Sequence, residues 1–331
     1  MHCAVLGSTG SGKSGAVAAI LHSILSHKAK ADAVCHPRIV VIDPHGEYGT
    51  AFGDRATVYR AYDPIGNEGA EGLSIDLPYW LMSAEEFRLL TIAKTEHEAT
   101  SQHNVIYKAL THARMEAAGL VDKAPTSHGG PVPADGGSPD APRPKAGVPQ
   151  AALDSFDRDK PRPFRLEELI NHILYLQAAR PNKSNVLESV TATAFAEEFK
   201  SILDKIGVLR RDPRIQFMMK EWDPEGPTLA SILGQFVGGI AGAQESDLRI
   251  LDISGLPNEV AGPMTAALAR LMFRYKVYQT KDERAKDPVL LVCEEAHRYV
   301  PDRGEAEYAA AQGAIRRIAR EGRKYGLGLM L

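Results

Sequence analysis

Two hydrophobic patterns alternate along the chain. Short, mostly apolar runs occur at residues 2–6, 38–43, 248–256 and 288–293, and such runs are typical of strands buried on both faces of a parallel sheet. Shorter candidates for strands lie at 56–62 and in the final residues, GLGLML. Between the runs, apolar residues recur every three or four positions, which is typical of helices that bury one face. The alternation predicts an α/β fold with a mostly parallel sheet.

A block of helical periodicity interrupts this core. Ser83 followed by Glu86 has the spacing of a capping box, so a helix is expected to begin there. We therefore predict a large helical insertion at residues 83–222, between two core segments at 1–82 and 223–331. The helices expected in the insertion extend from Ser83 to about Gly119, from Leu166 onwards, and from about Val186 to Ile206. In the second core segment, helices are expected around 259–279 and 305–323.

Residues 123–163 have a different composition. They hold a large share of the 21 prolines of the chain and almost no large apolar residues. Such a segment buries too little surface to offset the entropy lost on ordering, so it is predicted to be disordered. A proline-rich docking site is the alternative interpretation.

The first apolar run leads into GSTGSGKS, which fits the P-loop pattern G-x-x-x-x-G-K-S. Glycines allow backbone N–H groups to turn toward phosphate oxygens, the lysine supplies positive charge to the β- and γ-phosphates, and the final hydroxyl can ligate Mg²⁺. The helix that follows adds its partial positive charge. Because strand, loop and helix follow in this order, we predict an ATP and Mg²⁺ site rather than a chance glycine turn. Its predicted residues are Gly7, Ser8, Thr9, Gly10, Ser11, Gly12, Lys13 and Ser14.

Polar residues directly follow two other apolar runs. Glu294 and Glu295 directly follow the run at 288–293. We assign Glu294 to magnesium and Glu295 to the attacking water, which it would orient and deprotonate. The run at 38–43 ends in Asp43, and His45 follows two positions later. They are predicted to lie near the γ-phosphate, because their strand is expected to end beside the P-loop strand. An ordinary turn residue is the alternative for His45.

Composition indicates the cellular compartment of the protein more than it indicates its activity. The formal net charge of −3 gives no bulk basicity that would indicate nucleic acid, although a local basic channel is compatible with it. Three widely spaced cysteines form no C-x-x-C pair, which disfavours zinc and favours a reducing cytoplasm. No stretch approaches the roughly 20 apolar residues of a membrane span, and no secretory signal precedes the P-loop.

Four motifs together resemble the HerA branch of the HerA–FtsK ATPases. They are GSTGSGKS (7–14), DPHGEY (43–48), EEAHRYVP (294–301) and AREGRKYGLGLML (319–331). DPHGEY is the most specific, since a generic P-loop protein has no reason to carry it. The resemblance implies a RecA-like core and an ATP-driven DNA translocase. It also implies double-stranded DNA, a homo-hexameric ring, and a nuclease or other effector subunit in DNA end processing or antiviral defence, without a membrane.

The resemblance leaves other functions open. One is an ATP-dependent regulatory scaffold for an effector enzyme, and another is a conjugative-transfer ATPase. A DEAH-type helicase with two tandem lobes is disfavoured, because DPHGEY is foreign to that class. Family members usually carry a β-barrel before the P-loop and a glutamine-containing sensor after the last strand. In this sequence only six residues precede Gly7, and Leu331 comes before the position of the sensor. The chain is therefore expected to be an ATPase core truncated before the sensor.

The most basic stretch of the chain is AIRRIAREGRKYG at 314–326. The resemblance aligns its last part with the R-E-G-R-K segment of the family, and we predict that Arg320 or Arg323 acts across a subunit interface as an arginine finger. For Arg316 and Arg317 we favour a solvated helix face or an interface role. The chain departs from the family pattern at one site residue: Glu294 stands where aspartate is the common choice.

Overall fold

The computed structural model describes most of the chain as two compact units. The first unit consists of residues 1–77, 213–218 and 227–331, and the second of residues 78–212 and 219–226. The boundaries of the second unit differ by a few residues from those of the predicted insertion, and residues 213–218 belong to the first unit. The described residues are 2–8, 10–28, 38–62, 72–92, 100–238, 248–298, 300–301 and 308–331.

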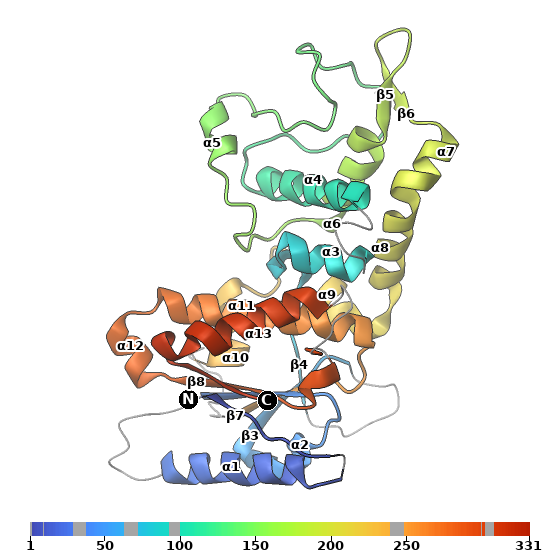
Figure 1. Ribbon diagram of the computed structural model, residues 1–331. Helices are drawn as coiled ribbons and strands as arrows, with labels where there is room; N and C mark the ends of the chain where they lie inside the picture. The colour runs from blue at the N-terminus through green and yellow to red at the C-terminus, as the bar shows by residue number, and fades with distance from the viewer. Residues whose placement is uncertain are drawn as a thin grey trace. The chain divides into compact units, whose positions relative to one another are not determined.

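A seven-stranded sheet is the centre of the first unit (Figure 1), and all its neighbouring strands pair in parallel. The strand order is β1-β9-β8-β2-β7-β3-β4. This arrangement confirms the predicted α/β class with a parallel sheet. The strands are β1 (His2–Cys3), β2 (Arg38–Asp43), β3 (Ala56–Arg60), β4 (Leu73–Ser74), β7 (Leu248–Asp252), β8 (Val289–Cys293) and β9 (Leu327–Met330).

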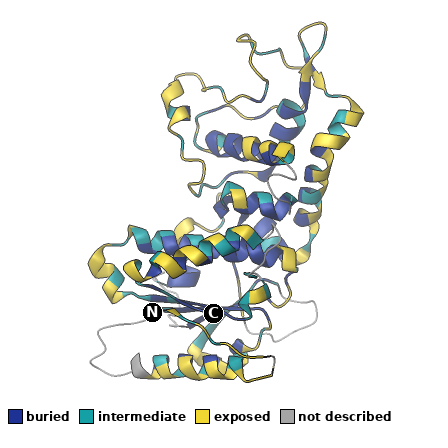
Figure 2. Ribbon diagram, viewed as in Figure 1, coloured by how far each residue is buried: buried dark blue, intermediate teal, exposed yellow. Residues whose placement is uncertain are grey.

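Helices cover both faces of this sheet, as Figure 1 shows. On one face, α1 (Lys13–Lys28) and α2 (Tyr48–Phe52) pack against alternate residues of the central strands, among them Ile39 and Val41. The intervening residues, Val40 and Ile42, are also fully buried. This burial on both faces explains the continuous apolar runs (Figure 2). The helices of the other face include α10 (Leu229–Val237), α11 (Asn258–Tyr278) and α13 (Ala309–Glu321); α12 (Lys281–Lys286) follows α11.

The second unit is built mainly from helices. Its first long helix, α3, begins with the predicted capping box: the Glu86 N–H donates to Ser83 Oγ at 3.2 Å, and the Ser83 N–H donates to the Glu86 carboxylate at 2.8 Å. The single helix expected from Ser83 to Gly119 is described as two, with residues 93–99 outside the described part. The helices are α3 (Ala84–Ile92), α4 (Thr100–Ala117), α5 (Gln150–Asp154), α6 (Leu166–Asn171), α7 (Ala192–Phe195) and α8 (Ser201–Arg211), with π-helical segments at His172–Gln177 and Ala196–Lys200; α9 (Gln216–Met219) follows α8 in the chain.

The helix predicted from Val186 begins later than expected. Residues 187–189 form β6 (Leu187–Ser189), which pairs in antiparallel with β5 (Ala179–Pro181). The turn between them is closed by Asn182, whose side-chain oxygen accepts from the N–H of Ser184 at 2.9 Å and of Val186 at 3.0 Å. Asn185 adopts a positive φ of 54°, which asparagine tolerates better than most residues. The turn therefore overrides the helical periodicity read from the apolar residues.

Residues 123–163 also differ from the prediction of disorder, because the structure describes the whole segment with a defined path. The segment does not build a core of its own. Leu153 packs with Met115 of α4 and with Val121 in a small buried cluster. The Gly129 N–H donates to the carbonyl of Leu187 at 2.9 Å. A segment poor in apolar residues can be ordered in this way by surfaces that neighbouring elements supply, which composition alone does not reveal.

Candidate nucleotide-binding site

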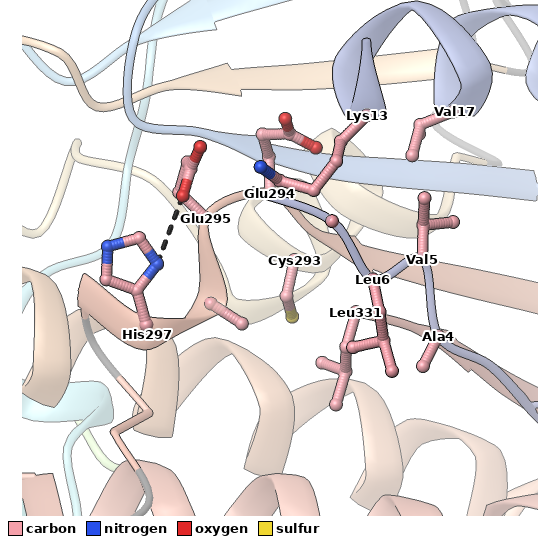
Figure 3. Close-up of a pocket in the computed structure, with 12 residues that line it drawn as sticks. Ala4, Val5, Leu6, Lys13, Val17, Cys293, Glu294, Glu295, His297 and Leu331 are labelled. Atoms are coloured by element: carbon pink, nitrogen blue, oxygen red, sulfur yellow. Dashed lines mark ion pairs between the residues drawn. The ribbon is translucent and has the colours of Figure 1, made fainter. Parts of the chain in front are cut away.

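Apart from Arg320 and Arg323, the predicted site residues of the first unit gather at one edge of the sheet. In a parallel sheet the carboxyl ends of all strands lie at the same edge, so the loops after β1, β2 and β8 meet there. A cavity of about 300 Å³ opens at this edge between the P-loop and the residues after β8 (Figure 3). Its lining consists of Ala4, Val5, Leu6, Gly7, Lys13, Val17, Cys293, Glu294, Glu295, Ala296, His297 and Leu331.

The P-loop has backbone geometry suited to phosphate. Gly10 and Gly12 have φ of 78° and 83°, in the left-handed region that favours glycine, so both glycines predicted to turn the loop are needed for its conformation. Helix α1 begins at Lys13, which places the helix N-terminus directly after the loop. The Lys13 ammonium donates to the carbonyl of Ser8 at 3.0 Å. Of the predicted loop residues, Thr9 lies outside the described part of the chain.

The clearest contact of the site joins the P-loop to the end of β8. The Ser14 hydroxyl donates to Glu294 Oε1 at 2.6 Å, although the two residues are 280 positions apart in the sequence. Glu294 is only 7% exposed. A hydroxyl and a carboxylate are the oxygen ligands that Mg²⁺ prefers. The donor set therefore fits magnesium, which Ser14 and Glu294 would hold as the sequence predicted.

Tyr48 completes this contact and was missed at the sequence level. Its hydroxyl donates to Glu294 Oε2 at 2.9 Å, and its ring is almost fully buried. Burial raises the pKa of Tyr48 far above its ordinary value, and the Glu294 carboxylate raises it further, so the phenol is neutral and remains a donor. The only available signal was the final letter of DPHGEY, and a motif cannot show which distant side chain a tyrosine reaches.

Asp43 organises the DPHGEY loop from inside. Its carboxylate is fully buried and accepts from the N–H groups of His45, Gly46 and Tyr48 at 3.1, 2.9 and 2.8 Å. Burial raises the pKa of Asp43, while the three N–H groups act in the opposite direction and the carboxylate of Asp252 adds to the rise. Asp43 thereby positions Tyr48. His45 is an exposed residue of this turn.

The expected neighbourhood of this loop was wrong in one respect. Strand β2 does not end beside the P-loop strand β1, since β9 and β8 lie between them. The loop still lies at the same carboxyl edge as the P-loop, and it meets the site through Tyr48 rather than through Asp43. The strand order could not be read from the sequence because β9 comes last in the chain and inserts next to the first strand.

Glu295 lines the same cavity as Glu294 and Lys13. Its side chain lies 22% exposed and forms an ion pair with His297 at 3.0 Å between Oε2 and Nδ1. The structure therefore brings Glu295 together with the P-loop.

The structure places the predicted arginines elsewhere. Arg320 is in the last turn of α13, and Arg323 is in the 3₁₀ turn at 322–325 that leads into β9. Both residues are exposed at the amino end of β9, whereas Glu294 and Glu295 follow the carboxyl end of β8. Arg317, by contrast, stacks over the ring of Phe273 at 4.5 Å. Arg320 and Arg323 therefore do not meet the glutamates of their own chain.

Comparisons with known proteins agree with this geometry. The family described as "Helicase HerA, central domain" matches residues 1–128. The solved structure of VirB4 of Thermoanaerobacter pseudethanolicus is similar with a TM-score of 0.51 and 13% identity, covering 99% of this chain and 68% of that chain. The bacterial conjugative coupling protein TrwB, as TrwBdeltaN70, gives a TM-score of 0.48 at 13% identity, over 99% of this chain and 62% of that one. No curated protein matches the chain significantly.

The parallel sheet, the P-loop at its carboxyl edge and the similarity to VirB4 define an α/β fold of the RecA-like P-loop NTPase class. The match to the HerA central domain covers residues 1–128, which include both the P-loop and DPHGEY, so the first part of the chain is similar to the family that the motifs predicted. None of the described helices combines the length and apolar character needed to cross a membrane.

Proposed function

We propose that this chain is the ATPase core of a ring-forming motor that uses ATP hydrolysis to move along double-stranded DNA. One observation carries the proposal: Ser14 and Glu294 lie within 2.6 Å of each other at a cavity that also contains Lys13 and Glu295. Phosphoryl transfer to water uses a cation on the phosphates, a magnesium site and a group that orients the water, and these four side chains can supply all three. A nucleotide-binding protein without hydrolysis would not require a second carboxylate beside the first.

The side chains divide the chemistry among them. Lys13 would neutralise the β- and γ-phosphates of bound ATP, and Glu295 would orient the attacking water and accept its proton. Bound magnesium, held by Ser14 and Glu294, would neutralise charge on the phosphate oxygens. Arg320 and Arg323 lie at the opposite end of the strands from the glutamates of the same chain. In this proposal one of them therefore reaches the nucleotide of a neighbouring subunit in a homo-hexamer.

The HerA-type match supports the wider role that we propose. The ring would act in the cytoplasm and feed duplex DNA to a nuclease or another effector subunit, in DNA end processing or in defence against phage. The alternatives are an ATP-dependent scaffold that regulates an effector and a conjugative-transfer ATPase. A motor and a scaffold differ in whether DNA controls the hydrolysis rate.

The test is ATP hydrolysis by the full-length protein with and without duplex DNA. We expect DNA to stimulate hydrolysis severalfold in the parent. Glu295→Gln should bind ATP and fail to turn it over, because an amide cannot act as the base. Glu294→Gln should instead raise the Mg²⁺ concentration needed for half-maximal rate. A rate that is measurable but indifferent to DNA would favour the scaffold, and exchanged phenotypes of the two glutamine variants would contradict the division of roles.

A further inference from the structure

Glu295 is held by an unusual backbone conformation. Its φ of 45° lies in the left-handed region, where a residue with a β-carbon rarely occurs, and Asn185 is the one other described non-glycine residue with positive φ. A short network fixes this backbone. The N–H of Arg298 donates to the carbonyl of Glu295 at 2.9 Å, and the N–H of Val300 donates to the carbonyl of Ala296 at 2.7 Å.

The guanidinium of Arg298 anchors the same turn to two other elements. It donates to the carbonyl of Pro44 in the DPHGEY loop at 3.2 Å and to Asn258 Oδ1 at the start of α11 at 3.0 Å. The main chain at Glu295 is therefore set by its surroundings. Only the side-chain torsions of Glu295 remain to decide where its carboxylate points.

One contact decides those torsions. Figure 3 shows His297 and Glu295 pointing toward each other at the edge of the cavity, joined through Nδ1 and Oε2 at 3.0 Å. An ionised carboxylate only accepts hydrogen bonds, so Nδ1 is the donor. The contact occupies one carboxylate oxygen and leaves the other for a water molecule. His297 is 75% exposed, and an exposed pair of this kind contributes little to folding stability. A contact of little structural value at this position points to a role in orientation.

We propose that His297 is a positioning residue for Glu295. By donating to Oε2, His297 selects the side-chain rotamer in which Oε1 faces the water that attacks ATP. This is the arrangement of a general base oriented by a third group. The inference rests on the proposed ATP hydrolysis, and it adds that the EEAH sequence supplies the orienting group as well as the two carboxylates.

The test compares His297→Ala with His297→Asn in the full chain. Asparagine carries an amide N–H close to the position of Nδ1, so it can keep the hydrogen bond without a titratable ring. We expect kcat of His297→Ala to fall on the order of 10–100-fold, the range for a misplaced catalytic group, with the ATP affinity unchanged within twofold. His297→Asn should recover most of the loss. His2→Ala, which removes an exposed histidine of β1 that does not line the cavity, is the control.

Three results would overturn the proposal: an unchanged kcat in His297→Ala, an equal loss of ATP affinity and kcat, or no recovery with asparagine. Crystal structures of the parent and of His297→Ala provide a reading that does not depend on hydrolysis. We expect the Glu295 carboxylate to move or to occupy several rotamers in the variant. A carboxylate that stays in place would refute the positioning role, even if the parent showed no ATPase activity and the proposed function failed for that separate reason.

Discussion

Replacing Tyr48 by phenylalanine tests whether the DPHGEY loop holds Glu294, the glutamate that we propose to bind magnesium. The variant keeps the buried ring and removes only the hydroxyl, which donates to Glu294 Oε2 at 2.9 Å. A hydrogen bond to a charged group contributes about 1.5–3 kcal/mol to stability. Glu294 is 7% exposed, so water replaces the lost donor poorly, while the Ser14 hydroxyl still satisfies Oε1. We therefore expect the free energy of unfolding to fall by about 2 kcal/mol.

The loss should be local to the first unit and visible in two assays. Urea unfolding gives the change in free energy, and hydrogen exchange of the β2 and β8 amides shows whether the sheet beside Glu294 is the part that weakens. Since Glu294 loses the hydrogen bond from Tyr48, the Mg²⁺ concentration for half-maximal hydrolysis should also rise severalfold. Tyr278→Phe is the matched control, because Tyr278 is 79% exposed and its hydroxyl faces solvent.

The outcome that would refute this reasoning is a Tyr48→Phe variant whose stability and Mg²⁺ requirement both stay at parental values. A double-mutant cycle with Glu294→Gln separates the pair from its surroundings. If the hydroxyl acts through the carboxylate, the two changes together should destabilise the protein by less than the sum of the single changes. Strict additivity would show that Tyr48 contributes only its ring.

Three further predictions follow from the site and the helical unit. Lys13→Ala should lose measurable ATP binding in calorimetry, and equal binding by variant and parent would contradict the P-loop assignment. Burial, together with the charge of His112, lowers the pKa of His172 to about 3 from 6.5, so between these values the unfolded chain binds the proton that the native one excludes. Stability should therefore fall by about 2 kcal/mol from pH 7 to pH 5 through His172, and His172→Phe should lack this part of the loss in urea titrations. Glu295→Gln and Arg323→Ala subunits, each inactive alone, should regain hydrolysis in mixed rings; verified mixed rings with no recovery, for Arg320→Ala as well, would exclude a finger from this segment.

Several features of the fold were predictable because their causes are local. The runs in β2, β7 and β8 are apolar at successive positions. A strand that helices cover on both sides needs apolar residues on both of its faces. The capping box at Ser83 and the glycines of the P-loop also act within a few residues of themselves. Local chemistry of this kind can be read along the chain without knowing what lies across the sheet.

The predictions that were wrong concern features whose causes lie outside the segment itself or outside its hydrophobic pattern. The hairpin at Asn182 replaced the first turns of a predicted helix, because a side chain closed a turn that apolar periodicity does not register. The order of residues 123–163 depends on Met115 of α4 and on the backbone of β6, which supply contacts from outside the segment. Composition describes what a segment can bury by itself and not what its neighbours offer.

The sequence by itself determined the phosphate loop, the two glutamates and the class of fold, since each follows from residues that are adjacent or regularly spaced. Only the tertiary structure decided that β9 and β8 separate β1 from β2, and that Tyr48 therefore contacts Glu294. It also decided that Arg320 and Arg323 lie at the opposite end of the strands from the glutamates. These relations depend on strand pairing between segments that are far apart in the sequence. The same pairing brings Ser14 within hydrogen-bonding distance of Glu294, although the two residues are 280 positions apart. Packing selects one such pairing by the free energy of the whole sheet, and no local pattern records it.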